Sequence, residues 1–213
     1  MAGFVYAARP PMDATNGPAD VSTRARILAA AAECFAKEGY QRARMVAVAE
    51  RAGVSRAGLY LHFPTKEALL AGLNESVIEE WLALSQRTLA AEGGALEAIG
   101  AWIREGLASE AQLAGVRVVT ADETQQALLL DRAATEDALA QTLRMLASVL
   151  RRGVRSGELA RDLDVSATAQ SLQAVLLGLL RNHVSERPLV DVRDERHVAA
   201  IVALVTRGIA KTG

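Results

Sequence analysis

The stretch at residues 53–69, GVSRAGLYLHFPTKEAL, constrains the fold of this chain more than any other part of it. Gly53 permits a tight turn, because a residue without a Cβ can enter backbone conformations that are closed to other residues. Ser55 has the chemistry of a helix N-cap. The helix that it opens can be only about two turns long, because Pro64 disfavours helical angles at Phe63. The stretch therefore predicts a tight turn followed by a short helix.

The short helix has a composition suited to a groove. Ala57 and Gly58 have almost no side chain, so the helix that carries them can come close to another surface. Thr65 then caps a much longer helix, in which Glu67 lies against the positive end of the helix dipole. The hydrogen-bond donors around the two small residues are Arg56, Tyr60, His62 and Lys66. Because such donors can bind phosphates, the pattern predicts a recognition helix.

Two more helices precede this one. The first has Ser22 or Thr23 as its cap and ends at Gly39, and its apolar residues recur at spacings of three and four. They are Ile27, Leu28, Ala31, Ala32 and Phe35. The second runs from about Met45 to Ala52 and would bury Met45, Val48, Ala49 and Ala52. Three short helices with a glycine turn before the third match the helix-turn-helix pattern.

These segments together resemble the N-terminal domain of the TetR family of transcriptional regulators. The residues that carry the resemblance are 27–31, 35–40, 48–55, 59–60 and 63–69. The resemblance covers about the first third of the chain after a short tail. It implies an all-helical homodimer that binds operator DNA, usually as a repressor that a small ligand releases.

Two residues depart from the pattern of the family. Arg44 stands where the family usually has Thr or Ser at the start of the second helix. Its side chain can reach a phosphate but cannot cap a helix as a hydroxyl does. Leu61 stands where a polar or basic residue is common, which leaves either a lost polar contact or an apolar contact with a thymine methyl group.

We therefore expect an all-α protein with three parts. Residues 1–20 form a disordered tail, residues 21–68 a helix-turn-helix DNA-binding domain, and residues 69–213 a helical domain for effector binding and dimerisation. Within the tail, Arg9 is a weaker candidate for a minor-groove contact. The residues expected to bind DNA are Arg44, Ser55, Arg56, Ala57, Gly58, Tyr60, His62 and Lys66.

Composition and charge agree with this division. Apolar residues make up 51% of the chain and aromatic residues only 4%, which favours helices packed on helices. Residues 22–68 hold eight Arg or Lys against four Glu, whereas residues 69–213 hold fifteen basic and nineteen acidic residues. A basic N-terminal part and an acidic remainder fit a protein that binds DNA at one end.

Enzyme chemistry has no candidate in this sequence. The three histidines, at positions 62, 183 and 197, are too scattered for a metal cluster, and no phosphate loop or nucleophile motif is present. We expect no catalytic residue, metal or cofactor. Cys34 is the only cysteine, so no internal disulfide can form and a cytoplasmic setting is expected. No apolar run approaches the length of a membrane span.

Helical spacing continues through the rest of the chain. The helix after Thr65 should end before Gly93-Gly94, and the next has an apolar stripe that includes Ile99 and Ile103. Residues 109–131 predict one or two irregular helices, and residues 138–157 a regular one. Two apolar helices follow, from Asp164 as a cap to about residue 185, and over about 192–210.

The last two helices predict an interface between two copies as a four-helix bundle. Its candidate residues are Leu172, Leu176, Leu179, Val198, Ile201 and Val205. Apolar side chains with a few polar groups predict an effector pocket in the preceding part of the body. Its candidate residues are Trp81, Trp102, Met145 and Gln173, which core packing alone could also explain.

The expected function is a DNA-binding repressor released by an apolar or amphipathic ligand. Two alternatives remain open at this point. One is a DNA-binding dimer without a small-molecule effector, and the other is an all-helical enzyme or carrier with an incidental helix-turn-helix.

Overall fold

The computed structural model describes residues 18–109, 132–185 and 187–211, and in these ranges every regular element is a helix. The helices are α1 (Pro18–Glu38), α2 (Met45–Ala52), α3 (Arg56–His62), α4 (Lys66–Leu89), α5 (Ala95–Ala108), α8 (Arg132–Ser156), α9 (Val165–His183) and α10 (Glu195–Ile209). This confirms the all-α fold. Most of the expected tail, with Arg9, and nearly all of residues 109–131 lie outside the described residues.

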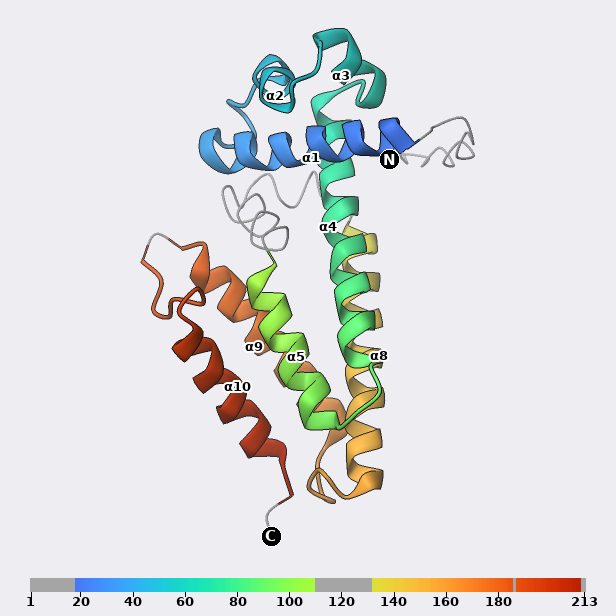
Figure 1. Ribbon diagram of the computed structural model, residues 1–213, viewed down its shortest axis with the longest axis vertical. Coiled ribbons are helices and arrows are strands. Elements are labelled where there is room, and N and C mark those ends of the chain that lie inside the picture. Colours follow the sequence, from blue (N-terminus) through green and yellow to red (C-terminus); the bar gives the residue numbers. More distant parts are fainter. Residues whose placement is uncertain (1–17, 110–131, 186, 212–213) are drawn as a thin grey trace, which may run out of the picture.

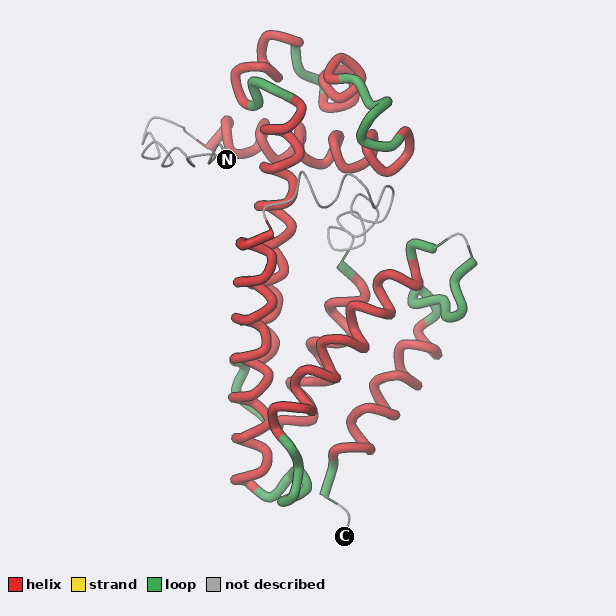
Figure 2. The backbone as a smooth tube through the Cα atoms, turned by 180° about the vertical axis from the view of Figure 1, so that it is seen from behind, coloured by secondary structure: helices red, strands yellow, loops and turns green. Residues whose placement is uncertain are grey.

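The helices form two groups that α4 connects (Figure 1). Helices α1, α2 and α3 lie together at one end, and α4 runs from them into the body. Helices α5 and α8 both pack against α4, α9 packs against α8 and α5, and α10 packs against α5 (Figure 1 and Figure 2). We call α1–α3 with the first turns of α4 the N-terminal unit, and the remaining helices with the rest of α4 the body.

Local chemistry sets the ends of the helices in the N-terminal unit. Gly53 ends α2 with φ +66°, a left-handed conformation that favours glycine. The Ser55 hydroxyl accepts a hydrogen bond from the Gly58 N–H at 2.9 Å, and the Thr65 hydroxyl accepts one from Ala68 N–H at 3.1 Å. The two predicted caps are therefore confirmed. Helix α1, in contrast, begins at Pro18, before the expected cap at Ser22 or Thr23.

Side chains also cap the N-termini of helices in the body. The Asp164 carboxylate accepts hydrogen bonds from the Ser166 and Ala167 N–H groups, which confirms the predicted cap of α9. Asp194 caps α10 in the same way through the Arg196 N–H, a cap that the sequence analysis did not identify. Helix α10 consequently begins at Glu195, later than expected.

Two separate groups of buried apolar side chains make up the core. The group in the N-terminal unit includes Phe35, Leu59 and Phe63, and the group in the body includes Trp102 and Leu176. Helix α4 contributes to both. Its members in the first group are Leu69, Leu70 and Leu73, and its members in the second are Trp81, Leu84 and Leu89.

The junction between the N-terminal unit and α4 depends on one close approach. The ring of Phe63, directly after α3, packs against Gly72 of α4, where a Cβ would lie only 2.6 Å from the ring carbon Cε1. The Arg24 guanidinium lies over the same ring, 5.4 Å from its centroid, and also bonds to Glu75 on α4. Helix α3 is thus fixed to the start of α4 through Phe63.

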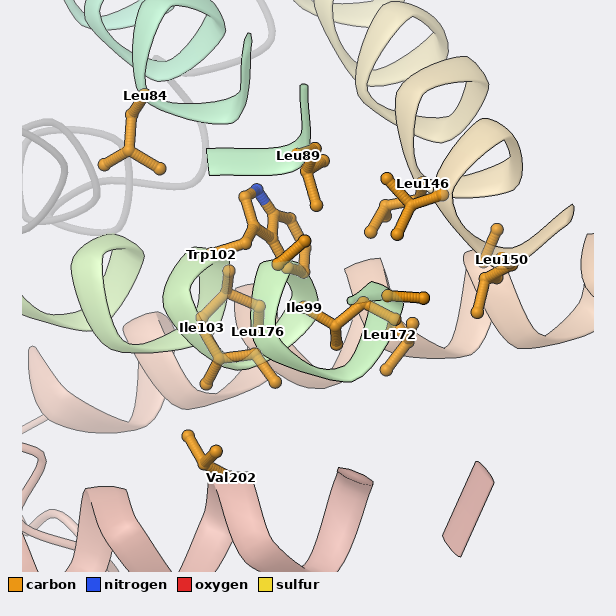
Figure 3. Packing of buried hydrophobic residues seen from close by; sticks show 14 of the residues in the cluster. Leu84, Leu89, Ile99, Trp102, Ile103, Leu146, Leu150, Leu172, Leu176 and Val202 are labelled. Atoms are coloured by element: carbon orange, nitrogen blue, oxygen red, sulfur yellow. The ribbon is translucent and has the colours of Figure 1, made fainter. Parts of the chain in front are cut away.

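A pair of tryptophans lies at the centre of the body. The rings of Trp81 and Trp102 meet edge to face, with their centroids 5.6 Å apart. The Trp81 indole N–H donates to the Thr142 hydroxyl at 2.9 Å, and the Trp102 indole N–H donates to the Ser85 hydroxyl at 3.1 Å. Figure 3 shows Trp102 between α4 and the leucines and isoleucines of the surrounding helices.

Candidate nucleic-acid interface

The orientation of α3 is set by Leu59, the only fully buried residue of this helix. Leu59 packs among the side chains of α1 and α2, so the opposite side of α3 faces away from the core. The Ser55 cap and the turn at Gly53 hold the start of the helix. Helix α3 is therefore presented at the surface in one defined orientation.

The predicted residues on α3 do not all face outward. Ala57 and Tyr60 are exposed, and Arg56 is exposed at the first turn. Gly58 and His62 are partly buried, and the Ser55 hydroxyl accepts from the Gly58 N–H. Leu61 is 85% exposed, far more than Tyr60 at 41%. The sequence left two interpretations of Leu61 open, a lost polar contact or an apolar contact with a thymine methyl group, and its side chain is available for such a contact.

Two arginines, one at the start of α2 and one at the start of α3, are available to an outside partner. Arg44 precedes the first residue of α2 and makes no side-chain capping bond, in agreement with the expectation for this position. Arg44 and Arg56 are both exposed, and neither guanidinium group has a hydrogen-bond or ion-pair partner within the described residues. Free guanidinium groups next to an exposed helix suit contacts with phosphate oxygens.

Lys66 is engaged within the protein instead. Its ammonium group donates to the Gln41 carbonyl at 3.0 Å and lies 4.6 Å from the centre of the Tyr40 ring. Burial lowers the pKa of Lys66 below the ordinary value for lysine, and the nearby Glu67 carboxylate partly opposes that shift. The structure thus gives Lys66 a role in joining the start of α4 to the segment between α1 and α2.

Most other arginines of the N-terminal unit are also used internally. Arg51 pairs with Glu33, Arg42 donates to the Glu38 carbonyl, and Arg26 donates to the Gly53 carbonyl. Basic residues counted along the sequence are therefore not equivalent. The excess positive charge includes groups that hold the unit together as well as the two free arginines near α3.

The residues predicted to line an effector pocket all lie in the body. Trp81 and Trp102 are in contact and buried, and Met145 is partly buried against the same group. Gln173 on α9 is 7% exposed, and its Oε1 atom has no hydrogen-bond partner among the described residues. Trp81, Trp102 and Gln173 are buried and Met145 is partly buried, and their contact with a ligand stays a prediction.

The residues predicted for the dimer interface divide into two sets. Leu172 and Leu176 of α9 are buried within the protomer, next to α5 (Figure 3). A Cβ on Gly106 of α5 would lie 3.0 Å from Leu176 Cδ2. Leu179, Val198, Ile201 and Val205 are only partly buried. The large apolar residues that are exposed on these helices are Val175, at 46%, and Leu204, at 77%.

The described ranges, residues 18–109, 132–185 and 187–211, hold neither a metal-ligand cluster nor a membrane-spanning helix. These ranges contain no group of three or more His, Cys, Asp or Glu side chains that could hold a metal ion. None of the helices described is both long and apolar enough to cross a membrane.

Comparison with known proteins gives the N-terminal unit a family. Residues 27–73 match the model of the bacterial regulatory proteins of the tetR family. This match contains α2 and α3 in full, together with the start of α4 that carries Leu69, Leu70 and Leu73.

Relatives and solved structures extend the likeness to the body. The fatty acid metabolism regulator protein of Bacillus subtilis (strain 168) is 27% identical over 147 residues, which span 69% of this chain and 76% of that protein. The nucleoid occlusion factor SlmA of Vibrio atlanticus (strain LGP32) is 29% identical over 156 residues, 73% of this chain and 78% of SlmA.

Among solved structures, the ketosteroid transcriptional regulator KstR2 of Mycobacterium tuberculosis has the same fold, with a TM-score of 0.68 and 23% identity. The alignment covers 89% of this chain and 95% of KstR2. Three observations indicate a DNA-binding regulator: the family match, the exposed helix α3 and the regulators among the relatives. None of them indicates an enzyme. The chain is a DNA-binding transcriptional regulator of the TetR family.

Proposed function

We propose that this regulator is a homodimeric repressor that leaves its operator when a small apolar or amphipathic ligand binds the body. The observation that carries the proposal is that α4 belongs to both cores. Leu69, Leu70 and Leu73 at its start pack in the N-terminal unit, while Trp81, Leu84 and Leu89 pack in the body. A change in the packing of the body would therefore move the helix to which α3 is fixed.

The proposed dimer uses the outer faces of α9 and α10. Val175 and Leu204 are large, apolar and exposed in the protomer, and Ile201 and Val205 flank them on α10. Two copies would bury these faces against each other as a four-helix bundle. Such a dimer presents two α3 helices, which have to lie about 34 Å apart to enter successive major grooves.

The dimer is tested by a charge on the outer face. Leu204→Asp is the suitable substitution, because Leu204 is 77% exposed and the change leaves the protomer core intact. Sedimentation at micromolar concentration should show a dimer for the wild type and a folded monomer for this variant. Leu189→Asp, at a 94% exposed position between α9 and α10, is the control and should remain dimeric. A wild-type monomer would overturn the proposed assembly.

The proposed ligand site centres on Gln173 and the tryptophan pair. Both indole N–H groups already have partners inside the protein, whereas Gln173 Oε1 is buried without one among the described residues. A buried polar atom without a partner is costly, and a ligand donor group would relieve that cost. The name of the Bacillus relative refers to fatty acid metabolism, which supports an effector with a long apolar part.

Binding of the effector can be tested without knowing its identity. Fatty acids of increasing chain length serve as amphipathic probes, sugars serve as polar ones, and thermal shift detects binding. A probe that stabilises the protein should weaken the binding of the protein to a selected DNA duplex. The duplex should weaken the binding of the probe by the same factor. The expected coupling is about 1–3 kcal/mol, measured from either side.

Matched variants on α9 test the proposed role of Gln173. Gln173→Leu removes the buried acceptor, while Gln170→Leu makes the same change at an exposed position of the same helix. Only Gln173→Leu should lower the affinity of the protein for the probe. DNA binding by the probe-free protein should survive in both variants. Equal probe affinity in the two variants would remove Gln173 from the site.

A second candidate function is supported by the likeness to SlmA, whose name refers to nucleoid occlusion and not to a small ligand. Under this alternative the chain is a DNA-binding dimer whose body has no small-molecule effector. The two functions differ in the probe experiment. A body without an effector would show no probe that both stabilises the protein and weakens its binding to DNA.

A further inference from the structure

The outward side of α3 is apolar, and apolar side chains do not bind phosphates. With a turn of about 100° per residue, Ala57 and Leu61 each lie about 160° around the helix from buried Leu59. They therefore form the ridge of α3 that projects furthest from the core. Neither side chain carries a hydrogen-bonding group, and Leu61 is 85% exposed.

Folding of the N-terminal unit gives no reason for this leucine. The other large apolar side chains at α3, Leu59 and Phe63, are buried. Helix α3 is held by its Ser55 cap and by those two residues, so it does not depend on Leu61. An exposed leucine at the tip of a recognition helix is therefore available to the molecule that the helix meets.

The bases in a major groove differ in the groups that they present. Guanine, cytosine and adenine present hydrogen-bond donors and acceptors there, and thymine adds an apolar group, the methyl on C5. A ridge made of a methyl group and an isobutyl group can form no hydrogen bond with a base edge. The chemical group that it matches is the thymine methyl.

We propose that Leu61, with Ala57 beside it, recognises the C5 methyl group of a thymine in each operator half-site. The proposal rests on the DNA-binding role of α3. The free guanidinium groups of Arg44 and Arg56 would position the helix on the backbone, and Leu61 would add discrimination between bases.

The test uses the full-length protein and DNA that differs by a methyl group alone. A duplex is first selected from a randomised pool, and each of its thymines is then replaced in turn by uracil, which pairs identically but lacks the methyl. Affinities are measured at one fixed salt concentration, because binding to DNA depends strongly on salt. For the wild type, uracil at one position of each half-site should weaken binding about fourfold, the effect of one methyl group losing its burial.

Three variants identify the residue that senses the methyl group. Leu61→Ala should bind the thymine and uracil duplexes equally. Leu189→Ala truncates a leucine that is 94% exposed on a loop of the body, and it should keep the fourfold preference. Arg56→Ala should weaken binding to both duplexes by the same factor, because a phosphate contact does not sense the methyl group.

Two results would overturn the inference while leaving the DNA-binding role intact. One is equal affinity of the wild type for thymine and uracil at every position of a duplex that it binds tightly. The other is a Leu61→Ala variant that keeps the full thymine preference. If no duplex is enriched from the pool, the DNA-binding role of α3 fails together with the inference. Loss of the ligand response alone would affect only the proposed repressor.

Discussion

The N-terminal unit and the body place their polar side chains in opposite ways. The buried polar residues of the described chain are Ser85, Thr88, Thr142 and Gln173, and all four lie in the body. The core of the N-terminal unit is apolar throughout its described residues. Its characteristic polar groups, Arg44, Arg56 and Tyr60, are at the surface around α3.

This difference separates two ways of achieving specificity. Exposed groups on a short capped helix can select an outside partner, and they contribute little to folding. Buried polar groups are costly unless they are bonded, so each one restricts the packing around it. The bonds from Trp81 to Thr142 and from Trp102 to Ser85 fix how α4, α5 and α8 pack in the body.

The largest expected effect comes from truncating the body's central aromatic side chain. Trp102→Ala removes a fully buried indole and leaves the Ser85 hydroxyl without its donor. It should lower the free energy of unfolding by about 3–5 kcal/mol. Tyr60→Ala on α3 should change it by less than about 0.5 kcal/mol while weakening DNA binding. Urea denaturation and DNA titration of both variants measure the contrast.

A small loss of stability in Trp102→Ala would contradict the comparison, since it would mean that the centre of the body is loosely packed. Trp102→Phe is the variant for ligand studies, because it keeps most of the ring volume and removes the N–H donor. A Trp102→Phe protein that is stable and has lost its probe response would place this tryptophan in the ligand site.

The next effect concerns a carboxylate that joins distant parts of the body. Glu158, after α8, accepts hydrogen bonds from the Ala95 N–H at 2.6 Å and the Leu96 N–H at 2.9 Å, both at the start of α5. Its backbone carbonyl accepts from the Lys211 N–H beyond α10. Glu158→Ala should lower the free energy of unfolding by about 2 kcal/mol, because two helix N–H groups lose a charged acceptor. Chemical denaturation checks this value.

A matched control is available at Glu97, an exposed carboxylate in the first turn of the same helix α5. Glu97→Ala also removes a negative charge near the helix N-terminus and should cost less than about 1 kcal/mol. Equal losses for the two variants would mean that the charge near the helix end matters and the two hydrogen bonds do not.

The fold of the N-terminal unit could be predicted closely because its signals are local. Gly53, Ser55 and Thr65 act within four residues of their own positions, so their roles can be inferred from neighbours in the sequence. The bounds of α2, from Met45 to Ala52, are those expected. The face of α3 was harder to predict: the sequence left the role of Leu61 open, and only the burial of Leu59 shows that Leu61 lies on the outward side.

Prediction was less complete in the body, where the outcome depends on packing between distant residues. Periodicity could show that Leu172 and Leu176 are apolar and lie on one side of α9. It could not show whether that side meets α5 of the same protomer or a second copy. Similarly, the partner of Trp81 is Thr142, 61 residues away, and no local pattern indicates such a pair.

A smaller effect separates free from engaged basic residues at the DNA face. Arg44→Ala and Arg56→Ala should each weaken binding to specific and random DNA alike. Each should also reduce, by about one unit, the magnitude of the slope of log affinity against log salt concentration. Lys66→Ala should also destabilise the N-terminal unit, because it removes a bond to the Gln41 carbonyl and the contact with Tyr40. Titrations at several salt concentrations, with a thermal melt of each variant, distinguish the two classes.

An unchanged affinity and slope in both arginine variants would remove this face from the DNA interface. A Lys66→Ala protein with wild-type stability and a reduced slope would instead place Lys66 with the free cations, against its internal bonding.

The smallest expected effect is a dependence of stability on alkaline pH in the N-terminal unit. Burial, followed by the charge and hydrogen bond of Glu67, raises the pKa of Tyr40 from 10.0 to about 12. The Tyr40 hydroxyl donates to Glu67 Oε1 at 3.2 Å, a bond that the phenolate cannot make. Because the folded state holds this proton more tightly, the contribution of Tyr40 is complete below about pH 10 and is lost as pH rises toward 12.

Lys66, in contact with the Tyr40 ring, acts in the opposite sense, since its lowered pKa makes the folded state release a proton first. The dependence of wild-type stability on pH is therefore the sum of the opposing contributions of Tyr40 and Lys66. Comparison with Tyr40→Phe isolates the phenol: the wild type should lose more stability than this variant between pH 9 and 11.5. Tyr40 is partly exposed, so solvent screening should keep the difference below about 1 kcal/mol. Identical thermal unfolding profiles for the two proteins would show that the bond to Glu67 contributes nothing.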